Sequence, residues 1–321
     1  MNQREHIITL QQYMNTRIIG QPELVQNLLI ALLADGHLLV EGAPGLAKTR
    51  AIKELAEAIE GDFHRVQFTP DLLPADLTGT EIYRPQEGTF EFQKGPIFHN
   101  LILADEINRA PAKVQSALLE AMAEQQISVG SQTYPLSDLF LVMATQNPIE
   151  QEGTYPLPEA QLDRFLMHVR VDYPDTESEL KILQLTRKEA HLNAEAVAPE
   201  SELTQADLFA ARDAVLDIHM TEALERYLVE FIMASRNPEK YDPELDRWIE
   251  YGASPRASMA LDRCARAHAW LAGKDYVSPD DIQAVAHSVL RHRILLSYEA
   301  EADGVNTDQV IDKLIELIAV P

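Results

Sequence analysis

The feature that most constrains this chain of 321 residues is a phosphate-loop pattern near its N-terminal end. A short apolar run, His37 to Glu41, comes before the loop, and helical spacing begins after it. The loop consists of Gly42, Ala43, Pro44, Gly45, Leu46, Ala47, Lys48 and Thr49. Glycines let backbone N–H groups turn toward a phosphate chain, and the free donors at a helix N-terminus stabilise the same anion. A strand, such a loop and a helix in this order predict a nucleotide-binding α/β domain.

Three residues of this region have specific expected roles. Lys48 should reach the β- and γ-phosphates of ATP, and the Thr49 hydroxyl should ligate Mg²⁺. Arg50 completes the predicted nucleotide-binding set. Ala47 stands where a second glycine is usual. Because this position opens the helix, ordinary helical dihedrals are expected there, and alanine adopts these easily. We therefore expect nucleotide binding to survive the replacement.

A second strand is predicted from Leu101 to Asp105, and its apolar residues lead to two acids, Asp105 and Glu106. Asp105 is expected to hold the Mg²⁺ shell, because ligands bind at the carboxyl ends of parallel strands. Glu106 should point elsewhere and polarise the attacking water, a task that only a hydrolysing protein needs. An acidic pair after a strand is otherwise typical of a helix N-cap. Its spacing behind a phosphate loop favours the catalytic interpretation.

A third apolar run, Leu139 to Thr145, leads to Gln146, Asn147 and Pro148. Asn147 would then lie beside the other two strand ends. Its amide is expected to hydrogen-bond the γ-phosphate or the lytic water. Taken alone, an Asn-Pro pair would only indicate a turn.

The chain divides into two parts. Residues 1–175 are predicted to form an α/β core, a parallel sheet flanked by helices, because short apolar runs alternate with helical patterns there. A fourth strand is expected at His64 to Phe68. Residues 176–321 are predicted to form a smaller all-helical domain. The core helices are expected at Thr49 to Glu60 and Pro111 to Gln125, and the others at Leu203 to Leu216, Glu222 to Arg236, Arg256 to Ala272 and Pro279 to His292.

Two inserts in the core are expected to be hairpins, at about residues 76–95 and 126–136. In the first, Glu81 to Tyr83 and Thr89 to Gln93 flank a turn-rich segment. In the second, Gln126 to Val129 and Gln132 to Tyr134 flank Gly130 and Ser131. On the residues alone, a merely decorative surface role is as good an explanation as a functional one.

The charge composition limits the classes of molecule that the protein is expected to bind. The chain has 27 Lys and Arg against 51 Asp and Glu, a formal net charge of −24. This charge opposes attraction to phosphate backbones and to anionic membranes, so nucleic-acid binding is not expected. The polar N-terminus predicts neither secretion nor membrane insertion. The single cysteine, Cys264, is expected to be a buried packing residue, which suits a reducing cytoplasm.

Several segments together resemble the MoxR family of AAA+ ATPases. They are the loop from Gly42 to Thr49, the run Ala104 to Pro111, the run Ala144 to Glu152 and the segment Thr154 to Phe165. The resemblance implies a ring, expected to be a hexamer, whose active sites lie between neighbouring subunits. It implies that Arg164 is an arginine finger reaching a neighbour's nucleotide, although on local grounds Asp163 and Arg164 resemble a surface pair. It makes Arg256 the sensor arginine, acting on its own or a neighbour's nucleotide.

The same resemblance places Ile19 and Gly20 against the adenine and the two inserts near the central opening of the ring. It implies an ATPase that remodels or matures a client, with von Willebrand factor A domain proteins among the expected partners. Two alternatives remain at this stage. One is a magnesium-chelatase-like ATPase subunit, which would carry the same motifs, and the other is a nucleotide-dependent scaffold with little hydrolysis.

Overall fold

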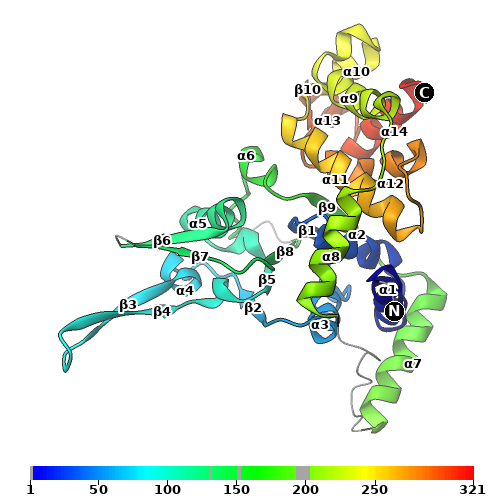
Figure 1. Cartoon of the computed structure of the whole chain (residues 1–321). Helices are drawn as coiled ribbons and strands as arrows, with labels where there is room; N and C mark the ends of the chain where they lie inside the picture. Colours follow the sequence, from blue (N-terminus) through cyan, green and yellow to red (C-terminus); the bar gives the residue numbers. More distant parts are fainter. Residues whose placement is uncertain (1–2, 131, 150–152, 193–202) are drawn as a thin grey trace.

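A five-stranded parallel sheet lies at the centre of the computed structural model, which describes residues 3–130, 132–149, 153–192 and 203–321 (Figure 1). The strands follow one another across the sheet in the order β2-β5-β8-β1-β9, joined by parallel ladders. Their carboxyl ends therefore meet at one edge. The strands are β1 (Leu38–Gly42), β2 (Phe63–Gln67), β5 (Leu101–Asp105), β8 (Leu141–Gln146) and β9 (Met167–Val171).

The central strands are apolar along most of their length because both faces of the sheet are covered. Successive side chains of β5 point to opposite faces. Leu101 and Leu103 belong to one hydrophobic cluster, whereas Ile102 and Ala104 belong to another. Since both faces are filled with apolar side chains, polar groups gather at the carboxyl edge of the sheet.

The core helices begin where the sequence supplies start signals. Helix α2 has Pro22 at its first position, and α3 starts at Lys48, directly after the phosphate loop. Helix α1 was not predicted, although its buried side chains Ile7, Leu10 and Met14 have helical spacing. The helical segments are α1 (Gln3–Arg17), α2 (Pro22–Leu33), α3 (Lys48–Ala58), α4 (Pro74–Thr78), η1 (Pro96–Phe98), η2 (Ile107–Arg109), α5 (Ala112–Glu124) and α6 (Glu159–Leu162).

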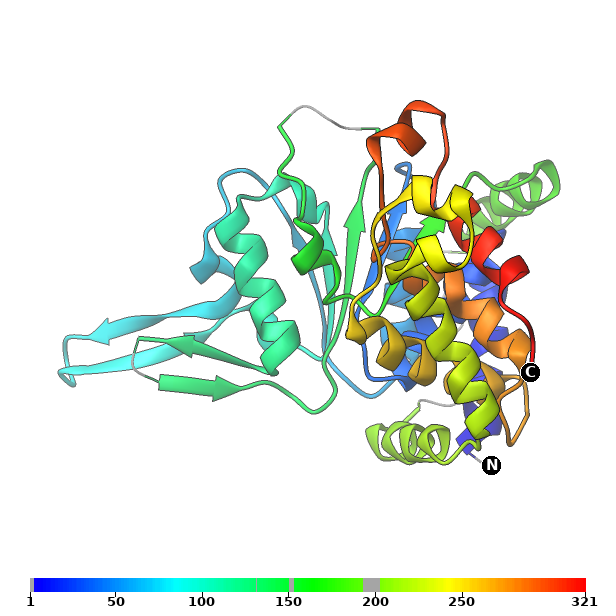
Figure 2. The same ribbon diagram turned by 90° about the horizontal axis from the view of Figure 1, so that it is seen from above.

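Both expected hairpins are present and project from the body on the same side (Figures 1 and 2). The first pairs β3 (Gly79–Arg84) with β4 (Thr89–Lys94), and the second pairs β6 (Gln126–Val129) with β7 (Gln132–Pro135). The rings of Phe92 and Tyr134 stack with centroids 4.1 Å apart, which joins the two hairpins. Ser131 lies outside the described residues, as do residues 150–152 of the segment used for the family resemblance.

The second part of the chain is helical, as predicted, with one difference. Strands β10 (Ile249–Tyr251) and β11 (Leu295–Leu296) form a two-stranded antiparallel pair, which was not expected because both are too short to show a period. The helices are α7 (Thr176–Leu192), α8 (Gln205–Leu216), α9 (Glu222–Arg236), η3 (Pro238–Lys240), α10 (Pro243–Trp248), α11 (Pro255–Leu271), α12 (Pro279–Leu290), α13 (Tyr298–Ala302) and α14 (Thr307–Leu317).

An N-terminal capping contact explains where α12 begins, and burial explains the role of Cys264. The Ser278 backbone N–H donates to the Asp281 carboxylate across 2.7 Å, the capping contact that a serine three residues before an acid predicts. Cys264 is buried on α11, and burial raises the pKa of its thiol to about 12. It is a packing residue, as expected.

The two parts share one hydrophobic cluster. Buried residues from Ile7 on α1 to Leu314 on α14 belong to it, and α8 contacts α1, α2 and α11. The fold class is confirmed as an α/β core with a helical second domain, while the division between residues 175 and 176 stays a prediction. Within the described part of the chain, no helix is long and apolar enough to cross a bilayer.

Candidate functional site

The phosphate loop joins β1 to α3 at the carboxyl edge of the sheet. Gly45 has φ +86°, and a Cβ at this position would meet no atom within 4 Å, so glycine is used there for its backbone freedom. Ala47 also lies in the left-handed region, with φ +58° and ψ +14°. The expectation of ordinary helical dihedrals at Ala47 is therefore wrong. The residue precedes the helix as its N-cap and takes the conformation that glycine adopts without strain.

Lys48 lies inside the loop that it is expected to serve. Its Nζ atom donates to the Gly42 carbonyl at 2.5 Å and lies 3.4 Å from the Gln146 carbonyl at the end of β8. Burial lowers the pKa of Lys48, and the nearby carboxylates of Asp105 and Glu106 oppose that effect. An ammonium group held in this way, partly desolvated and facing carbonyls, is suited to binding an anion.

A cavity of about 410 Å³ adjoins the phosphate loop. Ile19 lines it together with the loop residues from Pro44 to Ala47 and Arg50. Gly20 holds the neighbouring chain close, because a Cβ there would lie 2.9 Å from the side chains of Pro174 and Ser178. Further lining residues were not predicted, and they include Arg17, Tyr173, Glu179, Ile182 and Leu185, several of them on α7.

Arg50 is held against α7. Its two terminal nitrogens contact the Glu189 carboxylate at 3.2 and 2.5 Å, and Arg17 contacts the same carboxylate at 3.0 Å. The hydrogen bond from Arg50 lowers the pKa of Glu189. These ion pairs tie α7 to the first turn of α3, so the helix covers one side of the cavity beside the phosphate loop.

The acidic pair at the end of β5 is arranged by a threonine on the neighbouring strand. The Thr145 hydroxyl donates to Asp105 Oδ1 at 2.6 Å and accepts from the Glu106 backbone N–H at 2.9 Å. Glu106 has φ +57°, a strained conformation for a residue with a side chain. Glu106 thus leaves the strand and serves as the N-cap of η2.

Two residues on β2 also contact the acids, and neither was predicted. Arg65 contacts Asp105 Oδ2 through Nε at 3.1 Å and through a terminal nitrogen at 2.6 Å. The Gln67 amide donates to Glu106 Oε2 at 2.7 Å. Their only sequence signal is the alternation of polar residues with Val66, which puts both on one face of the strand. The contacts depend on β2 being next to β5.

Asn147 lies directly after β8 and is buried. Its side-chain oxygen accepts from the Ile149 backbone N–H at 3.1 Å, which fixes the amide at the strand end. Because β8 lies between β5 and β1, Asn147 takes its place between the acidic pair and the phosphate loop. The structure thus brings together the ends of the three strands that were expected to carry the site.

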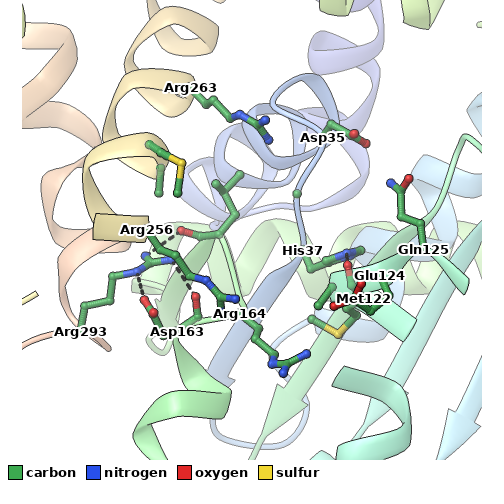
Figure 3. A pocket seen from close by; sticks show the side chains of 15 residues that line it. Asp35, His37, Met122, Glu124, Gln125, Asp163, Arg164, Arg256, Arg263 and Arg293 are labelled. Carbon is green, nitrogen blue, oxygen red and sulfur yellow. Dashed lines mark hydrogen bonds and ion pairs between the residues drawn. The ribbon is translucent and has the colours of Figure 1, made fainter. Parts of the chain in front are cut away.

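Arg164 and Arg256 lie elsewhere. Both line a cavity of about 460 Å³ formed with Asp35 to His37, which precede β1, and with Leu166, which precedes β9 (Figure 3). This cavity is at the amino edge of the sheet. β1 has five residues, so at roughly 3.3 Å per residue its two ends are ~16 Å apart. Neither arginine is placed to reach the phosphate loop of its own chain.

The carboxyl edge fits a magnesium nucleotide. Mg²⁺ prefers oxygen ligands and usually keeps several waters, binding through one or two carboxylates together with substrate phosphates. Asp105 and the exposed Thr49 hydroxyl are oxygen ligands of this kind. Within the described ranges, no cluster of three His, Cys, Asp or Glu side chains could hold a metal ion.

Comparison with known proteins agrees with this geometry. A family model described as "ATPase family associated with various cellular activities (AAA)" matches residues 37–167, and one described as "AAA lid domain" matches residues 246–314. Chaperone MoxR1 of Mycobacterium tuberculosis is 45% identical over 305 residues, which cover 95% of this chain and 79% of the relative. Protein MoxR of Paracoccus denitrificans is 34% identical over 327 residues, covering 96% and 94%.

A solved structure extends the likeness to three dimensions. A protein of Cytophaga hutchinsonii assigned as an ATPase superposes with a TM-score of 0.91 at 46% identity, covering 99% of this chain and 96% of that chain. Sequence identity and fold thus agree over nearly the whole length. The chain belongs to the MoxR family of AAA+ ATPases.

Proposed function

We propose that this protein binds ATP with Mg²⁺ at the carboxyl edge of its sheet and hydrolyses it in a homo-hexameric ring to remodel a partner protein. The observation that supports this most is the hydrogen-bonded group at three adjacent strand ends. Lys48 contacts the end of β8, and Thr145 of β8 contacts the acids at the end of β5. A triphosphate bound by the loop would lie against all three strand ends.

Binding rests on the loop and the adjoining cavity. Lys48 exchanges its carbonyl contacts for the β- and γ-phosphates, and the backbone N–H groups at the start of α3 face the same anion. A bound Mg²⁺, held by Thr49 and Asp105, would neutralise charge on the phosphates. Ile19 and the apolar side chains of α7 offer a surface for the adenine ring.

Hydrolysis rests on Glu106 and Asn147. Glu106 orients and deprotonates the attacking water, while the Asn147 amide hydrogen-bonds the γ-phosphate or that water. We expect the left-handed backbone at Glu106, restrained by Thr145, to turn its carboxylate away from the metal position.

The two arginines act on a neighbouring subunit. Since Arg164 and Arg256 line a cavity at the amino edge of the sheet, whereas the phosphate loop lies at its carboxyl edge, we assign both to the nucleotide of the adjacent protomer. A guanidinium that reaches the γ-phosphate stabilises the charge of the transition state and accelerates hydrolysis about 10³- to 10⁵-fold in other nucleotide hydrolases. For Arg256, we thus propose the neighbouring nucleotide in place of its own, a choice that the sequence left open.

The conformational change driven by ATP hydrolysis acts on a client protein in the cytoplasm. One relative is named as a chaperone, and the joined hairpins expose Tyr83 and Phe90, which are 52% and 67% accessible. Aromatic side chains on a projecting hairpin are suited to contact a partner such as a von Willebrand factor A domain protein.

Mixed assemblies test the shared site. Lys48→Ala should abolish nucleotide binding, whereas Glu106→Gln and Arg164→Ala should each bind ATP and hydrolyse it slowly. Combining Glu106→Gln subunits with Arg164→Ala subunits should restore turnover, because some interfaces then pair an intact Glu106 with an intact Arg164. Verified mixed rings that stay inactive would refute hydrolysis between subunits.

Assembly and client have separate measurements. Native mass determination with and without ATP gives the number of subunits, and six is expected. Proteins that co-purify with ATP-loaded Glu106→Gln assemblies identify the client. A monomer at all nucleotide concentrations would contradict the ring.

A further inference from the structure

The carboxylate of Asp163 connects the segment that carries Arg164 to the lid helix that carries Arg256. Its Oδ2 atom accepts from the Ser254 hydroxyl at 2.8 Å. Its Oδ1 atom accepts from Arg293 Nε at 2.8 Å (Figure 3). Ser254 precedes α11, and Arg293 follows α12. One side chain of the core thus binds the ends of two lid helices.

The Ser254 hydroxyl extends this link to Arg256. As the N-cap of α11, it accepts from the Arg256 backbone N–H at 3.2 Å while it donates to Asp163. A serine hydroxyl has one proton to donate and lone pairs to accept, so both bonds are satisfied at once. The backbone of Arg256 is therefore separated from Asp163 by a single oxygen atom.

Arg293 fixes the chain on the other side of Arg164. Its side chain is only 2% exposed, and its terminal nitrogens donate to the carbonyls of Phe165 at 2.6 Å and Leu166 at 3.1 Å. The planar fork of an arginine can make these bonds together with the bond to Asp163, whereas a lysine has a single nitrogen. The residues directly before and after Arg164 are both held by the lid.

Arg164 and Arg256 differ from Arg293 in the partners of their guanidinium groups. Arg256 is exposed, and Arg164 donates to the Leu119 carbonyl at 2.8 Å. Within the described residues, no carboxylate forms an ion pair with either guanidinium, although the chain carries a net charge of −24. Their backbones are thus restrained while their charges are left for an external anion.

We propose that Asp163, held by Ser254 and Arg293, is a positioning residue that sets the spacing between Arg164 and Arg256, so that both guanidinium groups reach the neighbour's nucleotide together. This inference rests on the proposed function. It predicts that a defect at Asp163 lies in what a subunit gives to its neighbour and not in its own nucleotide site.

Mixed assemblies distinguish these two kinds of defect. Asp163→Asn keeps the size of the side chain but removes its charge. It should lower kcat by about 10²-fold, the usual effect of a displacement of about 1 Å in a catalytic group, and leave ATP binding by each subunit within twofold. Mixing Asp163→Asn with Glu106→Gln subunits should restore turnover. Mixing it with Arg164→Ala subunits should not, because no subunit then supplies a correctly placed finger.

The reference mixture separates failure of the inference from failure of the proposed function. If Glu106→Gln with Arg164→Ala recovers activity but Glu106→Gln with Asp163→Asn does not, the positioning role is wrong. If the reference mixture itself stays inactive in verified rings, the proposed shared site is wrong and this inference falls with it.

Serine variants test the same link should Asp163→Asn fail to fold. Ser254→Ala should lower kcat roughly tenfold without changing KM and should be complemented by Glu106→Gln subunits, whereas Ser254→Thr, which keeps the hydroxyl, should have wild-type activity. Ser297→Ala is the matched control, since Ser297 also caps a lid helix but contacts neither Asp163 nor Arg164. If Ser254→Ala and Ser297→Ala lose kcat equally, the loss comes from a less stable lid and not from the link to Asp163, and the proposal is overturned.

Discussion

The Thr145 hydroxyl lies 2.6 Å from Asp105 Oδ1 and 2.9 Å from the Glu106 backbone nitrogen, so one side chain of β8 restrains both acids of β5. Thr145→Val keeps the shape of the residue but leaves the Glu106 N–H without its partner. A loss of about 1 to 2 kcal/mol is expected for such an unpaired group. ATP hydrolysis should fall about tenfold if this loss applies to the transition state, with ATP affinity unchanged. Steady-state kinetics measure both, and Thr145→Ser should restore the rate.

Arg65 occupies the carboxylate oxygen of Asp105 that faces β2, and its side chain is 50% exposed. An exposed ion pair of this kind stabilises by at most about 1 kcal/mol, so Mg²⁺ can compete with it. Arg65→Ala should lower the Mg²⁺ concentration needed for half-maximal binding of a fluorescent ATP analogue, by roughly two- to fivefold. Arg84→Ala is the control, because the Arg84 pair with Glu91 lies in a hairpin. A higher Mg²⁺ requirement in Arg65→Ala would show that the arginine assists the metal.

The protein should be less stable with alanine at position 47 than with glycine there. Its left-handed backbone costs about 1 to 2 kcal/mol for a residue with a Cβ, against about 0.4 to 1 kcal/mol of extra chain entropy that glycine loses on folding. Ala47→Gly should therefore raise the free energy of unfolding by about 1 kcal/mol, as measured by urea denaturation without nucleotide. Gly45→Ala should lower it, although a Cβ there meets no atom. A lower free energy of unfolding in Ala47→Gly than in the wild type would contradict the strain at Ala47.

The buried imidazole of His37 should make folding sensitive to acid. Burial lowers its pKa to about 4 from the usual 6.5, while its neutral ring accepts from the Val142 N–H at 3.1 Å and contacts the Met122 carbonyl at 3.2 Å. The unfolded chain binds this proton below about pH 6.5 and the folded chain does not, so stability is full above pH 6.5 and is lost as pH falls toward 4. The loss from His37 is roughly 3 kcal/mol.

His37→Gln should flatten this dependence in unfolding experiments at pH 7.5 and pH 5, and the surface variant His219→Gln should not. His292 is also buried with a lowered pKa, so part of the acid sensitivity should persist. If the free energy of unfolding of His37→Gln falls between pH 7.5 and pH 5 as much as that of the wild type, groups other than His37 cause the acid sensitivity.

Local patterns were sufficient to predict several elements of both domains with their bounds. The strand from Leu101 to Asp105 and the helix from Glu222 to Arg236 have the predicted bounds, because an unbroken apolar run and a clear helical period define them. The edge strand β9 and helix α1 were not predicted. Three buried side chains among polar ones on α1 are a weak signal, and β9 has polar residues at His168 and Arg170.

Contacts that depend on strand order could not be predicted in the same way. Arg65, Gln67 and Thr145 reach the acids only because β2 and β8 are the two neighbours of β5. The link from Asp163 to Ser254 spans 91 positions and appears only when the lid packs on the core. The dihedral angles of Ala47 were predicted wrongly because alanine favours helical dihedrals. The geometry of the phosphate loop instead requires a left-handed residue directly before α3.

The placement of the phosphate loop and the Arg164–Arg256 pair at opposite ends of β1 has a consequence for symmetry. If Arg164 and Arg256 act on the adjacent protomer, as proposed, each copy presents a receiving face and a donating face that differ. A contact between copies is then head-to-tail, and a two-fold dimer cannot satisfy both of its members. A linear row of subunits always leaves one receiver without a donor at its end. Under the proposed assignment, only closure into a circle gives every copy a complete catalytic centre.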